Sequence, residues 1–239
     1  MGRFNGLANN LSEAAFDAAG TIQTVGAAIS ALQGAPELPM PVVTVPEGSG
    51  KYFVFSDDPD GSAAPVNAFD GVILSAKYVN ERWNSKYGEA GGDKAPICQS
   101  EDGISGWDRD GCEYVCKACP YNRIGSGGGN AKACRNTARL TVLCAGETLP
   151  WRVKVPTMSV ANLTGYVARV LVPAGLPIDR VVTHFSLMKA VNSTGVTYSQ
   201  IMFAPVGKLS DENARLVSAL SANLNALTAG ETPKAIEGA

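Results

Sequence analysis

The sequence predicts a mixed fold, rich in β-strands and with helices at its ends. Short runs such as 51–56 and 150–155 alternate apolar and polar residues and are rich in aromatic or β-branched types, as half-buried strands are. The segments 8–33 and 210–227 instead repeat apolar residues with a helical period. All six cysteines lie between residues 98 and 144. We therefore expect strands around a core, terminal helices and a cysteine-rich insertion.

The N-terminal region is expected to be a helix followed by a linker. In 8–33 the apolar residues recur about every 3.6 positions, and Gly34 and Pro36 follow, which predicts an amphipathic helix within 1–34. Its small-residue face is interpreted as packing on the core, mediating self-association or contacting another protein. Four prolines and the run Gly48–Gly50 indicate a linker or extended arm over 35–50.

The remaining elements follow from alternation, turns and caps. Several strands are expected, together with an internal helix that Ser159 caps and a final helix that begins at Ser210. The folded domain is placed at 51–228, and the residues after it, 229–239, are expected to be a flexible tail. The expected strands and helices are 51–56, closed by a turn at 57–61, then 68–79, 138–144, 150–155, the helix 160–172, the hairpin 180–190 and 196–203, and the helix 210–227.

The cysteine spacing predicts a metal site. Cys116 and Cys119 are separated by two residues, so a tight turn can bring both thiolates to one ion. Cys112 precedes Cys116 by four positions and is an alternative to Cys98 as a ligand, whereas Cys144 lies in an apolar run and is interpreted as a small buried hydrophobe. The preferred zinc ligands are Cys98, Cys116, Cys119 and Cys134, with 17, 2 and 14 residues between them.

A disulfide framework is the main alternative for six clustered cysteines, and redox chemistry or simple packing are others. Disulfides require an oxidising compartment. The first ten residues have no basic stretch followed by an apolar core, so we expect no signal peptide and a reducing cytoplasm. Structural zinc is therefore favoured, and it would contribute on the order of 10 kcal/mol to folding this loop-rich segment.

Charge is unevenly distributed along the chain. The net charge is −2, but residues 114–155 carry seven basic residues and one acid, or about +6. Such a segment can collect phosphates, or can be an ordinary solvated face. In 150–155 the residues Trp151, Val153 and Val155 share one face of the expected strand, and the basic residues share the other. Core packing and base stacking both remain open for Trp151.

The sequence around the cysteines resembles that of a known family. The pattern runs Pro96-Ile97-Cys98, Asp102-Gly103, Cys116-x-x-Cys119-Pro120-x-Asn122, Gly125-Ser126 and Lys132-Ala133-Cys134. It is similar to a zinc-bearing family of single-stranded-DNA-binding proteins encoded by tailed phages and prophages, over about residues 68 to 228. Here Asn130-Ala131 precedes Lys132, where the family more often has Gly-Lys before Ala-Cys.

The resemblance implies an OB-fold. Together with the strand count, it gives the expectation of an OB-like five-stranded barrel with an inserted four-cysteine zinc module at 96–136 and flanking N- and C-terminal helices. It also implies binding of single-stranded DNA without strong sequence specificity in phage replication or recombination, in the host cytoplasm. The expected cofactor is structural Zn²⁺. Replication proteins and a second copy of the chain are candidate partners, and a membrane is not, because no run of 18 apolar residues exists.

The expected DNA site combines rings that stack bases with cations that neutralise phosphates. The stacking candidates are Trp83, Tyr121, Trp151 and Tyr198, and the phosphate candidates are Lys77, Arg123, Lys132, Arg135, Arg139, Arg152 and Lys154. The alternative function is a zinc-stabilised protein-interaction module of a replisome or virion assembly. No enzyme is expected, because four thiolates close a zinc shell and the sole histidine, His184, lies in the middle of an expected strand.

Overall fold

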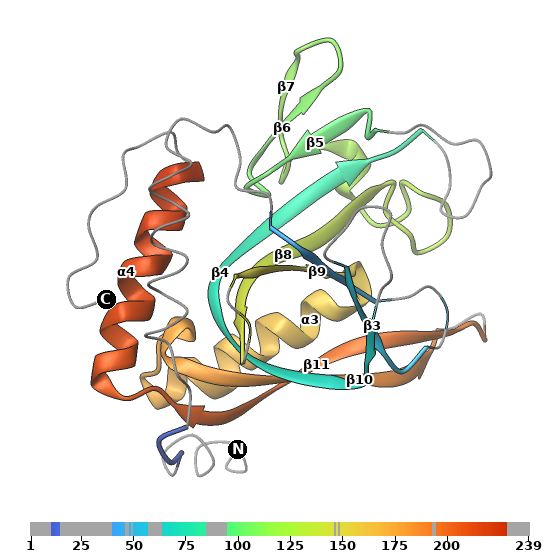
Figure 1. Cartoon of the computed structure of the whole chain (residues 1–239). Helices are drawn as coiled ribbons and strands as arrows, with labels where there is room; N and C mark the ends of the chain where they lie inside the picture. The colour runs from blue at the N-terminus through green and yellow to red at the C-terminus, as the bar shows by residue number, and fades with distance from the viewer. Residues whose placement is uncertain are drawn as a thin grey trace. The chain divides into compact units, whose positions relative to one another are not determined.

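The computed structural model describes residues 11–14, 40–45, 48, 50–56, 64–84, 95–145, 147, 149–192 and 195–228 (Figure 1). The chain divides into two compact units, which are described separately. Unit 1 comprises Met1–Ser75, Leu140–Lys154 and Ala161–Ala239, and unit 2 comprises Ala76–Arg139 and Val155–Val160. The described residues form a sheet-dominated structure with two α-helices, so the prediction of mixed β with helices is confirmed.

Unit 1 contains α4 and most of the strands, whereas β4, β8, β9 and α3 each have residues in both units. From one edge its strands are ordered β3-β2-β1-β9-β8-β4, and β10 and then β11 continue the pairing on the other side of β4. β1 pairs parallel with β9, whereas β10 pairs antiparallel with β4 and with β11. The elements are β1 (Val42–Thr44), β2 (Phe53–Ser56), β3 (Ala64–Val66), β4 (Ala68–Arg82), β8 (Cys134–Cys144), β9 (Trp151–Val155), α3 (Thr157–Tyr166), β10 (Val181–Val191), β11 (Thr197–Lys208) and α4 (Asp211–Thr228).

The hairpin and the last two helices lie close to where the sequence places them. β10 and β11 pair along their whole length, from Val181 opposite Lys208 to Val191 opposite Thr197, with one irregularity in the register after Val182. α3 continues into a π-helical turn and then a 3₁₀ turn, which ends at Gly175 with a φ of 65°. The backbone amide of Asn213 donates to the Ser210 hydroxyl at 3.2 Å, so Ser210 caps α4 as expected.

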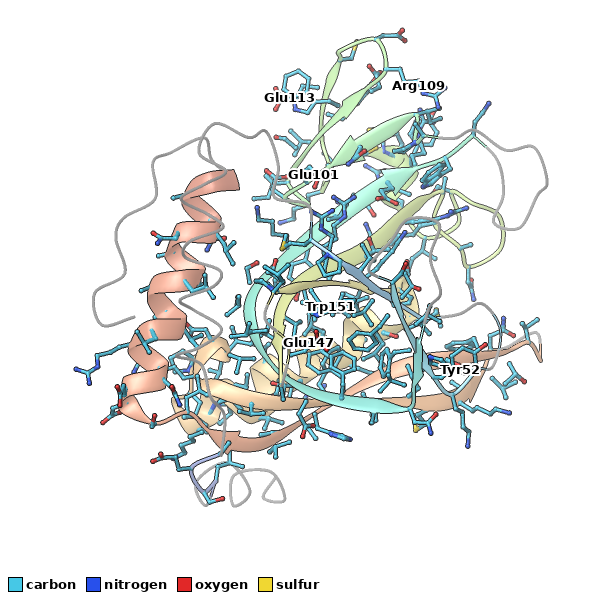
Figure 2. The ribbon with its side chains drawn as sticks, viewed as in Figure 1. Tyr52, Glu101, Arg109, Glu113, Glu147 and Trp151 are labelled. Carbon is cyan, nitrogen blue, oxygen red and sulfur yellow. The ribbon has the colours of Figure 1, made fainter. Side chains whose placement is uncertain are left out.

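An aromatic cluster fills the interior of unit 1. Phe69 of β4 stacks on Phe185 of β10 with 4.5 Å between ring centroids, and it meets Phe53 and Phe55 of β2 edge-on at 4.9 and 5.1 Å. Trp151 of β9 packs on Phe55 at 4.7 Å and is only 4% exposed (Figure 2). The base-stacking prediction for Trp151 is therefore wrong, because its ring lies in the core.

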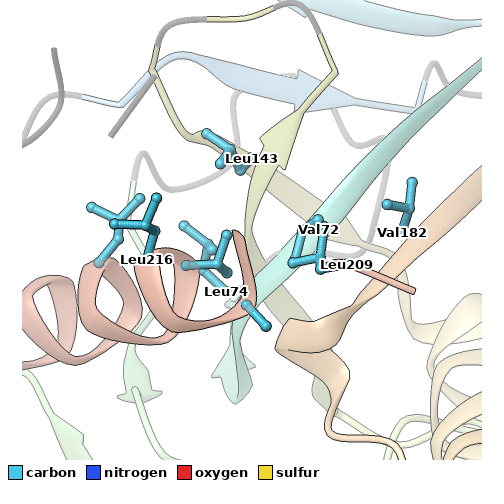
Figure 3. Packing of buried hydrophobic residues seen from close by; sticks show 9 residues of the cluster. Val72, Leu74, Leu143, Val182, Leu209 and Leu216 are labelled. Atoms are coloured by element: carbon cyan, nitrogen blue, oxygen red, sulfur yellow. The ribbon is translucent and has the colours of Figure 1, made fainter. Parts of the chain in front are cut away.

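The helix α4 covers a second apolar cluster of unit 1. Leu216, Val217 and Leu220 recur on one helix face and are buried. They belong to one cluster with Val72 and Leu74 of β4 and with residues of β8 and β10 (Figure 3). The Ser221 hydroxyl donates to the Leu74 carbonyl at 2.6 Å, which satisfies a polar group inside this contact.

The N-terminal predictions are partly corrected. Residues 11–14, inside the expected helix 8–33, are extended where described: the Ala14 amide donates to the Lys208 carbonyl at 2.9 Å, and the Lys208 amide to the Ser12 carbonyl at 3.0 Å. Val42–Thr44 lies in the expected linker 35–50 but forms β1, because the prolines flank this β-branched run without interrupting it. The other residues of 1–39, the turn 57–61 and the tail 229–239 lie outside the described residues.

The described strand pairing leaves the sheet open. Within the described part of the chain, no helix has the length and apolar character needed to cross a bilayer.

Gly71 of β4 lies close against β8, and it gives the first testable prediction. A Cβ there would lie 2.6 Å from Val142 Cγ1 and 2.9 Å from the Leu143 carbonyl oxygen. Gly71→Ala should lower the free energy of unfolding by about 1–3 kcal/mol through overpacking, measured by urea denaturation. The control is Gly165→Ala in α3, where a Cβ meets nothing within 4 Å. Equal stability of the two variants would contradict the close approach.

Candidate functional site

Unit 2 is a small antiparallel sheet with a long connection. Its strands are ordered β8-β4-β5-β6-β7, with a 3₁₀ turn, η1, between β7 and β8. The register places Arg82 opposite Cys98, and Cys98 opposite Asp108. The new elements are β5 (Cys98–Ser100), β6 (Ser105–Asp108), β7 (Glu113–Val115) and η1 (Pro120–Asn122).

The register assigns side chains to two faces of this sheet. Directly opposed residues on antiparallel strands point to the same side, and residues two apart on one strand do so too. We define the cysteine face by Arg82, Cys98, Gly106, Asp108 and Tyr114. The opposite face carries the row Glu81, Gln99, Trp107 and Glu113, of which Figure 2 labels Glu113.

The four predicted zinc ligands meet in one pocket on the cysteine face. All six cysteines of the chain are free thiols in this structure, which is the state that a metal site needs and a disulfide framework lacks. Cys112 is exposed and lies outside the pocket lining, so Cys98 is the better fourth candidate, and Cys144 is buried as expected. The pocket is lined by Asn80, Arg82, Cys98, Ser100, Tyr114, Cys116, Cys119, Tyr121, Asn122 and Cys134.

Gly106 leaves room for the sulfurs. A Cβ at this position would lie 3.3 Å from the Cys98 sulfur and 3.4 Å from the Cys116 sulfur, so any side chain would crowd both thiols. The turn beside them is held by its own hydrogen bonds. The Asn122 side-chain amide donates to the Cys116 carbonyl at 3.0 Å, and the Asn122 backbone amide donates to the Cys119 carbonyl at 3.1 Å.

The electrostatics of the pocket favour a cation. Burial, followed by the negative charges of the neighbouring Cys116, Cys119 and Cys98, raises the pKa of Cys134 to about 11, although the charge of Lys132 acts in the opposite direction. Burial also raises the pKa of Cys98, as does Cys119, while Arg82 lowers it. Cys98 and Cys134 thus resist ionisation, and a bound divalent cation would reverse that balance.

The donor set fits zinc chemically, since four thiols line one pocket and four thiolates can close a tetrahedral zinc shell. In the part of the chain that the structure describes, however, no three or more histidine, cysteine, aspartate or glutamate side chains are arranged as ligands around one point. Zinc ligation by these cysteines therefore stays a prediction.

The predicted DNA-binding residues are divided between the two units. Trp151, Arg152, Lys154 and Tyr198 belong to unit 1, and the others belong to unit 2. In unit 2 the exposed candidates are Lys77, Tyr121, Arg123 and Lys132, and the half-buried ones are Trp83, Arg135 and Arg139.

Two of the cations in unit 2 are already engaged. Arg139 forms ion pairs with Glu81 at 3.0 Å and Glu101 at 2.6 Å, so binding a phosphate would require it to leave two carboxylates. The Lys132 ammonium donates to the side-chain oxygens of Asn122 at 3.2 Å and Asn136 at 2.9 Å. These uncharged partners hold Lys132 beside the pocket, where its charge offsets part of the rise in the pKa of Cys134.

The shorter of two contacts between an arginine and an aromatic ring in unit 2 involves Arg82, a residue that the sequence analysis did not select. The Arg82 guanidinium carbon lies 3.8 Å from the ring centroid of Tyr121, whereas Arg135 lies 5.9 Å from that of Trp83. Trp107 and Tyr114, exposed aromatics of the cysteine-rich segment, were also missed, although their residue type in that segment was a usable signal.

Comparison of the chain with family models, with curated proteins and with solved structures finds no match. The interpretation of the site therefore depends on its geometry.

Zinc content tests the ligand assignment. Cys98→Ser and Cys134→Ser should each reduce the zinc retained per chain after gel filtration, because each removes a thiolate from the shell. Cys112→Ser and Cys144→Ala are the matched controls and should retain zinc like the wild type. Elemental analysis measures the ratio. Loss of zinc in Cys112→Ser, with retention in Cys98→Ser, would reverse the assignment.

Gly106 gives an independent test of the same pocket. Gly106→Ala should weaken zinc binding at least about tenfold, the lower range for residues that support metal ligands, because the added methyl crowds two sulfurs. Competition with a coloured zinc chelator measures this affinity. Gly165→Ala serves again as the control, and equal zinc affinities for both variants would show that the sulfurs do not need this space.

Proposed function

We propose that the chain binds single-stranded DNA without strong sequence specificity, in phage DNA replication or recombination, in the host cytoplasm. The observation that supports this most is Tyr121, a 44% exposed ring that an arginine backs at 3.8 Å beside the four-cysteine pocket. Every base has an aromatic face, so such a ring accepts any sequence. The proposal assigns no catalytic step to the chain. His184, the sole histidine, pairs with Asp70 at 2.6 Å across β10 and β4 of unit 1, which is a structural role.

The binding step follows from the side chains around this ring. A base stacks on Tyr121, and the exposed cations Arg123 and Lys132 neutralise flanking phosphates. Structural Zn²⁺, held by Cys98, Cys116, Cys119 and Cys134, would fix the connection from β7 to β8, from which all three of these residues project.

An OB-like barrel is the fold we propose for unit 1. The aromatic contacts support it, because rings from β2, β4, β9 and β10 converge on one interior, as the inward residues of a small barrel do. The strand pairing leaves the sheet open. An OB-fold is itself a partly open barrel, so the two descriptions are compatible.

A protein-interaction module of a replisome or virion assembly is the second candidate. Trp107 and Val115 are 55% and 60% exposed, and the register places both on the face opposite the cysteines, next to Glu113. An exposed tryptophan beside a valine is typical of a protein contact, and the neighbouring carboxylate disfavours phosphate.

Strand preference and salt dependence distinguish the two functions. Zinc-loaded protein should bind labelled poly-dT more tightly than the matched duplex, measured by fluorescence anisotropy. If about three phosphates are contacted, affinity should fall about twentyfold between about 50 and 200 mM salt. Absence of binding at low salt would contradict the proposal and favour a protein partner.

Removing one positive charge tests whether Lys132 itself contacts the DNA. Lys132→Ala should weaken poly-dT binding and reduce the slope of log affinity against log salt by about 0.7, the value for one lost contact on a single strand. Arg169→Ala, an exposed arginine of unit 1, is the control and should leave the slope unchanged. An unchanged slope in Lys132→Ala would remove this residue from the interface.

A further inference from the structure

Arg82 occupies a position that no sequence pattern indicates. Its backbone pairs with Cys98 across β4 and β5, and its side chain lines the pocket formed by the four cysteines. The same side chain places its guanidinium over the ring of Tyr121. One residue therefore contacts both the sulfur pocket and the exposed aromatic surface of unit 2.

The sulfur side of this contact is electrostatic. Four thiolates and one divalent cation together carry a charge of −2, so a fixed cation beside them stabilises the loaded site. The acid of the cysteine face, Asp108, accepts hydrogen bonds from the backbone amides of Asp110 and Cys112 and from the Tyr114 hydroxyl, at 2.9–3.0 Å. These bonds, that of the Cys112 amide above all, lower the pKa of Asp108, and the charge of Arg82 lowers it further. Arg82 is thus the cation of the pocket lining.

The ring side of the contact leaves one aromatic face open. The guanidinium covers one face of Tyr121, and the ring remains 44% exposed. The backbone of the ring is fixed, since Pro120 precedes it and the Ser126 hydroxyl donates to the Tyr121 carbonyl at 2.8 Å. A planar base on the open face would complete a stack of base, ring and guanidinium.

We propose that Arg82 is a positioning residue that couples the metal-loaded cysteine site to a nucleobase-stacking position on Tyr121. The metal-bound sulfurs hold the guanidinium, and the guanidinium holds the ring. This inference rests on the proposed function for its DNA part, and on the cysteine site alone for its metal part.

The metal part is tested first, without DNA. In chelator competition, Arg82→Met should lower zinc affinity about tenfold, as loss of a group supporting metal ligands does. Arg82→Lys keeps the charge and should stay within about threefold of the wild type. Arg169→Met, in unit 1, is the control. If Arg82→Met matches this control, the coupling is overturned, whatever the DNA result.

The DNA part uses a double-variant cycle on zinc-loaded proteins with poly-dT. Tyr121→Ala should lower affinity about tenfold, the loss expected for one stacked base. Arg82→Lys loses the planar group and should lower affinity about fivefold. The double variant should bind no more weakly than Tyr121→Ala, because both changes remove one stack. Additive losses would overturn the coupling.

The outcomes separate this inference from the proposed function. If the wild type binds no single-stranded DNA, the proposed function fails and the nucleobase part of the inference fails with it, while zinc affinity still decides the metal part. If the wild type binds DNA, but neither Arg82 variant changes zinc or DNA affinity, the function stands and the inference fails. Zinc-loaded Arg82→Lys covers the case in which Arg82→Met does not fold.

Discussion

Confinement of four thiols in one pocket is the constraint on which unit 2 depends. The cysteines come from β5, from the turn before η1 and from the start of β8, so their convergence closes two long connections at once. Burial and the charges of the neighbouring cysteines together raise the pKa of Cys134 to about 11. This thiol therefore stays protonated at neutral pH when no cation is bound, and packing alone then holds its sulfur. Ligation would convert that crowding into a cross-link.

The surface around the pocket follows from this confinement. Tyr121 is two residues after Cys119, and the Asn122 side chain donates to the Cys116 carbonyl, so the backbone that carries the ring is tied to the cysteine turn. Lys132 reaches the side chains of Asn122 and Asn136 from the residues before Cys134. The same short segments therefore carry the predicted zinc ligands, an exposed aromatic ring and an exposed cation.

Alternation in the sequence predicts faces well, but it does not say which rings are functional. Along β9 it separates Trp151, Val153 and Val155, all buried, from Arg152 and Lys154. That pattern already placed Trp151 with the apolar residues, and the stacking interpretation gave too little weight to it. The cysteine spacing identified four thiols that share a pocket, because a two-residue gap constrains geometry locally. The mixed fold of strands and helices could be predicted for the same reason, because that prediction requires only the local periodicity of apolar residues.

Contacts that depend on register could not be predicted. Arg82 meets Cys98 only because β4 and β5 pair with one particular offset, and sixteen positions of chain separate them without a turn signal that fixes it. Likewise, β1 lies between prolines, so the composition of this segment indicates a linker. It forms a strand because it pairs with β2 and β9. Both failures have one cause. The free energy that selects them comes from partners distant in sequence, so no window along the chain contains it, and a positioning residue such as Arg82 is visible only once the register is known.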